Sequence, residues 1–328
     1  MIREQWYVVL ESREVRKRPV GFLRMGERLV FWRDAAGKVV CHYDKCAHRG
    51  ASLAIGKLVD GCRIQCPFHG LEYDATGKCT LIPANGRAAP VPEAFRLRTY
   101  PTHEAHGFIW IWWGETEPAS EPKFFDDMPE GEFEYATTQD PWKNHYSRSI
   151  ENQLDMAHLP FIHYNTIGRG NRTVVDGPGL MRAEEGFFVY VYNRPDDGSP
   201  RRTSDEVPVP DPDSDFRLEF RFPNLWENRV GEKVRIVAAF VPIDDATTIL
   251  YLRFCQSFMR LPILKGLVGF FGKRTNLVIA HQDRRVVETQ IPVADGTGAG
   301  ENLFPGDLPI MEYRKMRLEA KKKLEGRR

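Results

Sequence analysis

Short apolar runs separated by turn residues dominate the first third of the chain. Three of them have the length of strands, namely residues 6–10, 28–32 and 39–42. Gly26 and Gly37 mark turns beside these runs. The run at residues 107–114, Gly-Phe-Ile-Trp-Ile-Trp-Trp-Gly, is continuous and aromatic, so it predicts a buried closing strand. Short strands at this spacing predict a small sandwich or barrel.

The rest of the chain predicts longer strands together with helices. The expected strands are residues 186–192, 216–222, 233–241 and 248–254. We expect residues 115–142 to be a connector and residues 309–328 to be a basic helix. Residues 194–215 contain five prolines, so we expect an exposed mobile loop there. This loop either covers a site, forms a subunit contact or is a plain surface insertion.

One motif places Asp155, His158 and His163 within nine residues. Read as a helix, it puts Glu151, Asp155 and His158 on one face, and Pro160 kinks or ends the helix so that His163 can swing back toward His158. Two neutral imidazoles beside carboxylates suit a non-haem Fe(II) site of the two-histidine, one-carboxylate kind. The alternative is that both histidines are satisfied by hydrogen bonds in the core.

The third ligand of such a site is expected to be a carboxylate. The pattern of residues 275–290 is helical, and one face gathers Ile279, Asp283, Val286, Val287 and Gln290. An aspartate on an apolar face is costly unless it is paired or binds a metal, so Asp283 is the expected ligand. A salt bridge between Asp283 and a neighbouring arginine is the alternative explanation. Other candidate ligands are Glu288, Asp244 and Asp245.

Two cysteine–histidine pairs lie upstream, Cys46-Ala-His48 and Cys66-Pro-Phe-His69, with seventeen residues between His48 and Cys66. If each pair sits at a hairpin tip, each tip supplies one thiolate and one imidazole to a metal. Glycines follow both tips, where the backbone must turn tightly. The four residues admit a tetrahedral structural zinc or a Rieske [2Fe–2S] cluster. The alternating order Cys-His, Cys-His suits two symmetric loops around a binuclear cluster.

With these motifs in place, the chain resembles the Rieske-type non-haem iron oxygenases, in particular the large subunit of single-subunit-type members similar to phthalate and vanillate oxygenases. The matching segments are residues 46–51, 66–74, 109–114 and 152–163, with Gly77 and Pro83. The resemblance implies an α+β fold. An N-terminal all-β Rieske [2Fe–2S] domain would span residues 1–117. A helix-grip catalytic domain, an antiparallel sheet with long helices, would span residues 118–328.

The resemblance also implies roles for the site residues. The cluster ligands would be Cys46, His48, Cys66 and His69, and the mononuclear Fe(II) ligands would be His158, His163 and Asp283. Asp155 would orient His158 and link to His69 across a subunit boundary, which implies a ring, commonly a homotrimer. Asn152 matches a family position near the iron.

The implied function is the terminal oxygenase component of a multicomponent enzyme. It would use O₂, and electrons from an NAD(P)H-dependent ferredoxin reductase or a ferredoxin, on a small aromatic or similar apolar organic substrate. The outcome would be monooxygenation (hydroxylation or demethylation) or, for a dioxygenase, cis-dihydroxylation. A steroid-like or alkaloid substrate is the alternative within this class. The alternatives outside it are a Rieske electron carrier and a zinc-stabilised binding module.

Charge, cysteine content and hydropathy limit the cellular compartments and the kinds of binding partner that we expect. The formal net charge of +1 gives no general attraction to nucleic acid. Six scattered cysteines do not form a secreted disulfide scaffold, and the first residues lack a signal-peptide pattern. The longest apolar run, residues 261–271, is interrupted by Lys265 and is too short to span a bilayer. We therefore expect a cytoplasmic protein with no nucleic-acid or membrane partner.

Overall fold

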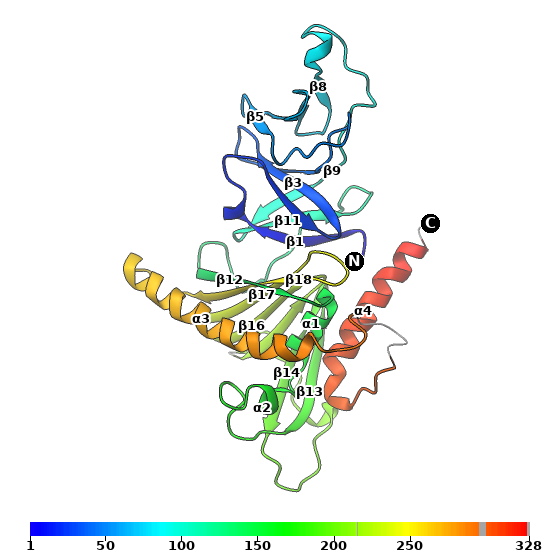
Figure 1. The fold of residues 1–328 in the computed structure, drawn as a ribbon. Coiled ribbons are helices and arrows are strands. Elements are labelled where there is room, and N and C mark those ends of the chain that lie inside the picture. The colour runs from blue at the N-terminus through cyan, green and yellow to red at the C-terminus, as the bar shows by residue number, and fades with distance from the viewer. Residues whose placement is uncertain (215, 295–299, 327–328) are drawn as a thin grey trace. The chain divides into compact units, whose positions relative to one another are not determined.

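The computed structural model describes residues 1–214, 216–294 and 300–326, and Figure 1 shows their ribbon. The chain divides into two compact units, which comprise residues 3–123 and residues 124–328. The first unit is built from strands, and the second combines one large sheet with helices. Together the two units give the α+β architecture that the sequence predicts.

Within residues 3–123, all of which the structure describes, eleven strands form three small antiparallel sheets. The first sheet has the order β1 (Gln5–Glu11), β11 (Phe108–Trp113), β10 (Thr102–Ala105). The second has the order β2 (Val20–Arg24), β3 (Glu27–Arg33), β4 (Val39–Tyr43), β9 (Thr99–Tyr100). The third is the meander β5 (Lys57–Val59), β6 (Arg63–Gln65), β7 (Glu72–Asp74), β8 (Cys79–Leu81). Short 3₁₀ turns follow β1 and β8, η1 (Ser12–Glu14) and η2 (Pro83–Asn85).

Two hairpins of this unit turn through the same Asp-x-x-Gly sequence. In the turn after β3, Asp34 Oδ1 accepts hydrogen bonds from the amides of Ala36 and Lys38 at 3.0 and 2.9 Å. Asp74 closes the turn after β7 in the same way. Gly37 and Gly77 end the two turns at φ of +82° and +80°, a conformation that costs glycine little. The aromatic run at residues 107–114 is buried as predicted and lies in the middle of its sheet.

Among the described residues of the second unit, seven strands form one antiparallel sheet. Its order is β12 (Glu134–Trp142), β18 (Thr248–Gln256), β17 (Val234–Pro242), β16 (Leu225–Gly231), β15 (Arg217–Arg221), β14 (Gly186–Arg194) and β13 (Val174–Ala183). The four predicted strands correspond to β14, β15, β17 and β18. The predicted connector at residues 115–142 is wrong in its last part, because β12 begins at Glu134. Strands β13 and β16 were not predicted.

The missed strands break the usual rules of strand composition. Pro141 lies in β12 and Pro178 in β13, and both strands are edges of the sheet, where a missing amide hydrogen costs least. The register of β13 shifts between Asp176 and Gly179, so Pro178 sits at an irregularity. In β16 the buried side chains include Glu227, which alternation of apolar and polar residues does not anticipate.

Four helices are seen in the described part of this unit, α1 (Tyr146–Leu154), α2 (Leu159–Ile162), α3 (Pro262–Val287) and α4 (Leu308–Glu325), with 3₁₀ turns η3 (Ser204–Glu206) and η4 (Pro305–Asp307). Figure 1 shows α3 running along the sheet, where it packs on β12 and β18. Helix α1 contacts α3, α4, β17 and β18. Among the described residues, no helix is both long and apolar enough to cross a bilayer.

Buried charges cover part of one sheet face. Glu227 on β16 is fully buried and lies among Asp127, Glu219 and Arg235, with the Arg235 Nε 3.0 Å from its Oε1. Burial, helped by the neighbouring carboxylates of Asp127 and Glu219, raises the pKa of Glu227 to about 8. The folded protein therefore holds a proton at Glu227 between the ordinary glutamate pKa and pH 8, whereas the unfolded chain does not.

This proton makes stability depend on pH. A carboxyl whose pKa is raised on folding loses stabilisation as the pH rises from its unfolded pKa toward its folded one. Glu227→Gln changes the free energy of unfolding by some amount at each pH. We expect this change to be about 2–4 kcal/mol more stabilising at pH 8 than at pH 5. Thermal unfolding at both pH values measures this. Glu232→Gln, at an exposed position, is the control. An equal effect of Glu227→Gln at both pH values would contradict the assignment.

Candidate functional site

Two loops of the first unit share one backbone design. Cys46 and Cys66 each accept a hydrogen bond at their carbonyl from a glycine four residues on, Gly50 at 2.9 Å and Gly70 at 3.1 Å. Both glycines have positive φ, +75° and +73°. The amide of each cysteine also donates a hydrogen bond of 2.8 Å to the carbonyl oxygen of the residue after the glycine. The two loops are therefore matched in their backbone hydrogen bonds, but only the second is a hairpin tip. It joins β6 to its antiparallel partner β7, whereas the first connects β4 and β5, which belong to different sheets.

The loops place thiols inside and imidazoles outside. Cys46 and Cys66 are buried, while His48 and His69 are exposed with ring centroids 4.7 Å apart. The Tyr73 hydroxyl lies 3.1 Å from the Cys46 sulfur. Burial, and then the neighbouring Cys46, raise the pKa of Tyr73 above its usual range, so its hydroxyl keeps its proton and can donate it to a thiolate at Cys46.

The spacing of these four donors suits two metal ions better than one. The donors around one tetrahedral zinc lie within about 4 Å of one another. Among the described residues, only two groups of three or more donors lie within 4.8 Å of one another, and Cys46, His48, Cys66 and His69 are not one of them. A binuclear cluster with thiolates on one iron and imidazoles on the other spreads its ligands in this way.

The second candidate site follows α1, and there the predicted helix is wrong in detail. Helix α1 ends at Leu154, and Asp155 is extended, with φ −86° and ψ 123°. A separate short helix, α2, begins after His158 and carries Pro160 in its first turn, where a missing amide hydrogen is harmless. Asp155 and His158 therefore flank a break between two helices instead of sharing one helix face, and Pro160 is not the kink.

The break nevertheless brings the three predicted iron ligands together. Asp283 Oδ1 lies 2.8 Å from His163 Nε2 and 3.4 Å from His158 Nε2. The donor atoms of all three residues lie within 4.8 Å of one another. Asp283 and His163 are 2% and 1% exposed and therefore buried, whereas the His158 side chain is 12% exposed and only partly buried. Two imidazoles and one carboxylate are the donors that a non-haem Fe(II) site requires, and the residues fit that metal.

Asp283 is not explained by a salt bridge to an arginine. Its neighbour Arg284 instead donates to Asp140. In the described part of the chain, the ion pairs of Asp283 are with His158 and His163 alone. The predicted helix face is partly wrong, because Val286 is exposed. The buried positions in this part of α3 are Asn276, Ala280, Asp283 and Val287.

Gln282 fixes one of these imidazoles, a contact that the spacing of ligand types does not reveal. His163 Nδ1 donates to Gln282 Oε1 at 2.8 Å, which fixes the ring so that its Nε2 faces Asp283. The same Oε1 accepts from Thr166 Oγ1 at 3.0 Å, and Gln282 Nε2 donates to Asn165. Burial lowers the pKa of His163, but the hydrogen bond and charge of Asp283 outweigh it, so the net shift is upward.

Asp155 and Asn152 differ in their relation to this set. Asp155 Oδ2 lies 3.4 Å from His158 Nδ1, on the opposite edge of the ring from Asp283, and Oδ1 accepts from the Ala157 amide at 2.7 Å. In contrast, among the described residues no hydrogen bond joins Asn152 to His158, His163 or Asp283, and its Nδ2 is buried without a partner.

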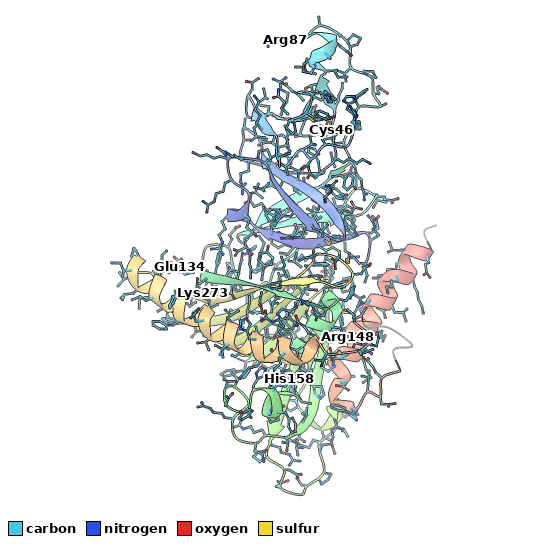
Figure 2. The ribbon with its side chains drawn as sticks, viewed as in Figure 1. Cys46, Arg87, Glu134, Arg148, His158 and Lys273 are labelled. Carbon is cyan, nitrogen blue, oxygen red and sulfur yellow. The ribbon has the colours of Figure 1, made fainter. Side chains whose placement is uncertain are left out.

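The other acidic candidates are engaged elsewhere. Glu288 accepts from the Lys143 amide at 2.8 Å, and Asp244 accepts from the Ala246 amide at 2.9 Å within its own turn. Glu151 accepts from Arg148 and Arg314 at 2.9 and 2.6 Å. Asp245 is exposed. Figure 2 labels Cys46 in the cluster loops and His158 at the start of α2.

Comparison with known proteins identifies the family to which the chain belongs. Residues 5–101 match the Rieske [2Fe-2S] domain family, and residues 142–322 match the vanillate O-demethylase oxygenase C-terminal domain family. The chain therefore belongs to the Rieske non-haem iron oxygenases. Members of this family carry a Rieske [2Fe–2S] cluster and a mononuclear iron, which confirms the two predicted cofactors and the predicted fold class.

Individual relatives span different shares of the chain. Chlorophyllide a oxygenase of Chlamydomonas reinhardtii is 37% identical over 52% of this chain and 26% of its own length. Protein TIC 55 of Arabidopsis thaliana is 32% identical over 95% of this chain and 58% of its own length. The chain thus spans at most about three-fifths of these two relatives.

A third relative is covered almost throughout. Methylxanthine N1-demethylase NdmA of Pseudomonas putida is 27% identical over 98% of this chain and 89% of its own length. The solved NdmA structure shares the fold, with a TM-score of 0.81 at 23% identity, over 98% of this chain and 92% of that one.

Tyr73→Phe tests the cluster loops. The hydroxyl strengthens its hydrogen bond to the Cys46 sulfur when the cluster gains an electron, so its removal should lower the reduction potential. We expect a fall of about 50 mV, which is roughly 1 kcal/mol for a one-electron step. A spectroelectrochemical titration measures it, with Tyr164→Phe, in the exposed part of the second unit, as control. An unchanged potential would separate Tyr73 from the cluster.

Gln282→Leu tests the support of His163. Without the Oε1 acceptor the imidazole can rotate or change tautomer, so iron affinity at the mononuclear site should fall by about 10–100-fold. Iron(II) titration of the apo site measures this. Arg285→Leu, at an exposed position of the same helix, is the matched control. Equal affinity in both variants would show that Gln282 does not hold the ligand.

Proposed function

We propose that this protein is the terminal oxygenase component of a multicomponent Rieske oxygenase. The observation that carries the proposal is the close set of His158, His163 and Asp283, with Asp283 Oδ1 at 3.4 and 2.8 Å from the two imidazoles. A three-ligand facial set leaves coordination positions open, as oxygen chemistry requires. The family matches over both parts of the chain support the same conclusion.

The ligand assignments are part of this proposal. Cys46 and Cys66 would hold one iron of the cluster through their buried thiolates, and His48 and His69 would hold the other through exposed imidazoles. His158, His163 and Asp283 would hold the mononuclear Fe(II). When bound, these groups supply electron storage and O₂ activation, and the protein supplies position and access.

The chain's own residues prepare the mononuclear site. Gln282 holds His163 in the tautomer with a free Nε2, and Asp155 faces Nδ1 of His158, where it can hold that ring in the same tautomer. Burial of Asp283 keeps water away from its carboxylate, so its charge acts on a bound cation at full strength. Asn152 is a further candidate residue near the iron, with an unpartnered buried amide nitrogen.

Electrons and substrate come from outside the chain. We expect an NAD(P)H-dependent ferredoxin reductase or a ferredoxin as donor, and a small aromatic or similar apolar compound as substrate. Relatives named for chlorophyllide oxidation and methylxanthine demethylation support oxygenation or demethylation as the reaction class. Their different substrates leave the particular compound of this protein to a screen.

The assembly and compartment that we propose follow from residues on the surface. Exposed His69 and half-buried Asp155 can meet between neighbouring subunits of a homotrimer, so that one subunit's cluster serves the next subunit's iron. The described cysteines are free thiols, which supports a reducing, cytoplasmic compartment.

Asp283→Ala tests the function directly. Loss of one iron ligand should reduce substrate-dependent O₂ uptake with a surrogate reductase by at least about 100-fold, because its charge and coordination hold the metal. Reduction of the cluster, followed by its visible spectrum, should not change. Glu288→Ala, at the C-cap of the same helix and outside the ligand set, should keep activity. Full O₂ uptake by Asp283→Ala would overturn the assignment.

A further inference from the structure

The first half of α3 carries an exposed row of large apolar side chains. Its members, with their exposed fractions, are Ile263 81%, Leu264 43%, Leu267 50%, Phe270 48% and Phe271 66%. Ile263, Leu267, Phe270 and Phe271 follow the spacing i, i+4, i+7, i+8, so they lie on one face of the helix. A contiguous apolar patch of this kind marks an interaction surface.

The opposite side of this half-helix is built from glycine. A methyl group on Gly269 would lie 2.9 Å from the Ala136 side chain, and one on Gly272 would collide with the ring of Phe254. The helix therefore approaches the sheet through its small residues and turns its bulky residues outward. This reverses the usual arrangement of a helix that covers a sheet, in which the large apolar side chains face inward.

The chain segment that carries the patch bears only positive charge. From residue 246 to residue 282 the sequence contains no Asp or Glu, whereas it contains Arg260, Lys265, Lys273 and Arg274. Lys265 pairs with Glu134 at 2.8 Å. The cationic groups of Lys273 and Arg274 lie 6.0 and 5.9 Å from the Phe270 ring, beside the apolar row. Figure 2 labels Lys273 on this part of α3.

We propose that residues 262–274 dock on an anionic membrane surface, with the helix lying in the headgroup layer. Ile263, Leu267 and Phe271 would enter the acyl boundary, and Lys273 and Arg274 would meet lipid phosphates. Apolar side chains on one face with flanking cations are the features by which interfacial helices bind anionic lipid. The same run is too short to span a bilayer, which is why the sequence alone predicted no membrane partner.

Charge also argues against a dimer in which this patch packs on the same patch of a second copy of the chain. Two copies meeting through this face would bring Lys273 and Arg274 of one against the same cations of the other, without a carboxylate in residues 246–282 to separate them. An anionic lipid surface instead neutralises these cations. The docking is independent of the oxygenase reaction, since the row contains none of the proposed iron ligands.

Flotation of the full chain with vesicles tests the proposal. We expect binding to vesicles of phosphatidylcholine with phosphatidylglycerol, weaker binding to phosphatidylcholine alone, and release by salt. The double variant Lys273→Gln/Arg274→Gln should lower the partition coefficient by roughly 25-fold, at about fivefold per cation. Ile263→Glu/Phe271→Glu should abolish binding. Ile55→Glu and Val209→Glu, at isolated positions 77% and 73% exposed, should bind as the unchanged protein does.

Two results would overturn the proposal. One is no partition of the unchanged protein onto anionic vesicles. The other is a change of oligomer mass in Ile263→Glu/Phe271→Glu, measured by sedimentation, without any lipid binding of the parent, which would make the row a contact between copies. Circular dichroism and O₂ uptake of each variant show that it is folded and active, so loss of binding is distinguished from loss of the fold or of the oxygenase.

Discussion

The buried carboxylate of Asp283 is the constraint on which the second unit depends. A carboxylate that is 2% exposed on a helix is costly unless cations or a metal surround it. Here two imidazoles from one short segment of chain approach the same oxygen. The break between α1 and α2 and the long helix α3 can therefore be understood as the framework that holds three donors around one point.

That framework extends beyond the ligands. Gln282, adjacent to Asp283 on α3, accepts from both His163 and Thr166, so the helix that supplies the carboxylate also orients the imidazole. The sheet contributes by holding α3 against β12 and β18. In the first unit, the backbone geometry of two glycine-ended loops positions the candidate ligands. These loops bury two cysteines and leave two histidines at the surface.

The sequence predicts those parts in which local pattern and structure agree. The spacing of Cys46, His48, Cys66 and His69 identifies the loops, and the apolar run at 233–241 identifies β17. Strand β16 was not predicted because it buries Glu227, and alternation of apolar and polar residues does not anticipate a buried glutamate. Tertiary contacts stabilise that residue instead. The interpretation of Pro160 as a kink fails because proline is equally suited to a first helical turn. The role of Gln282 was not predicted because no sequence spacing identifies an amide side chain that supports a ligand.

One measurement tests the central claim, that this chain holds two separate iron sites. Iron, zinc and acid-labile sulfide are determined on protein purified without added metal, together with the visible and EPR spectra. We expect a red-brown protein with a reduced-cluster EPR signal, as many sulfides as cluster irons, and one iron beyond the cluster that His158→Ala removes while the cluster signal stays. Zinc in place of iron, with no sulfide, would contradict it.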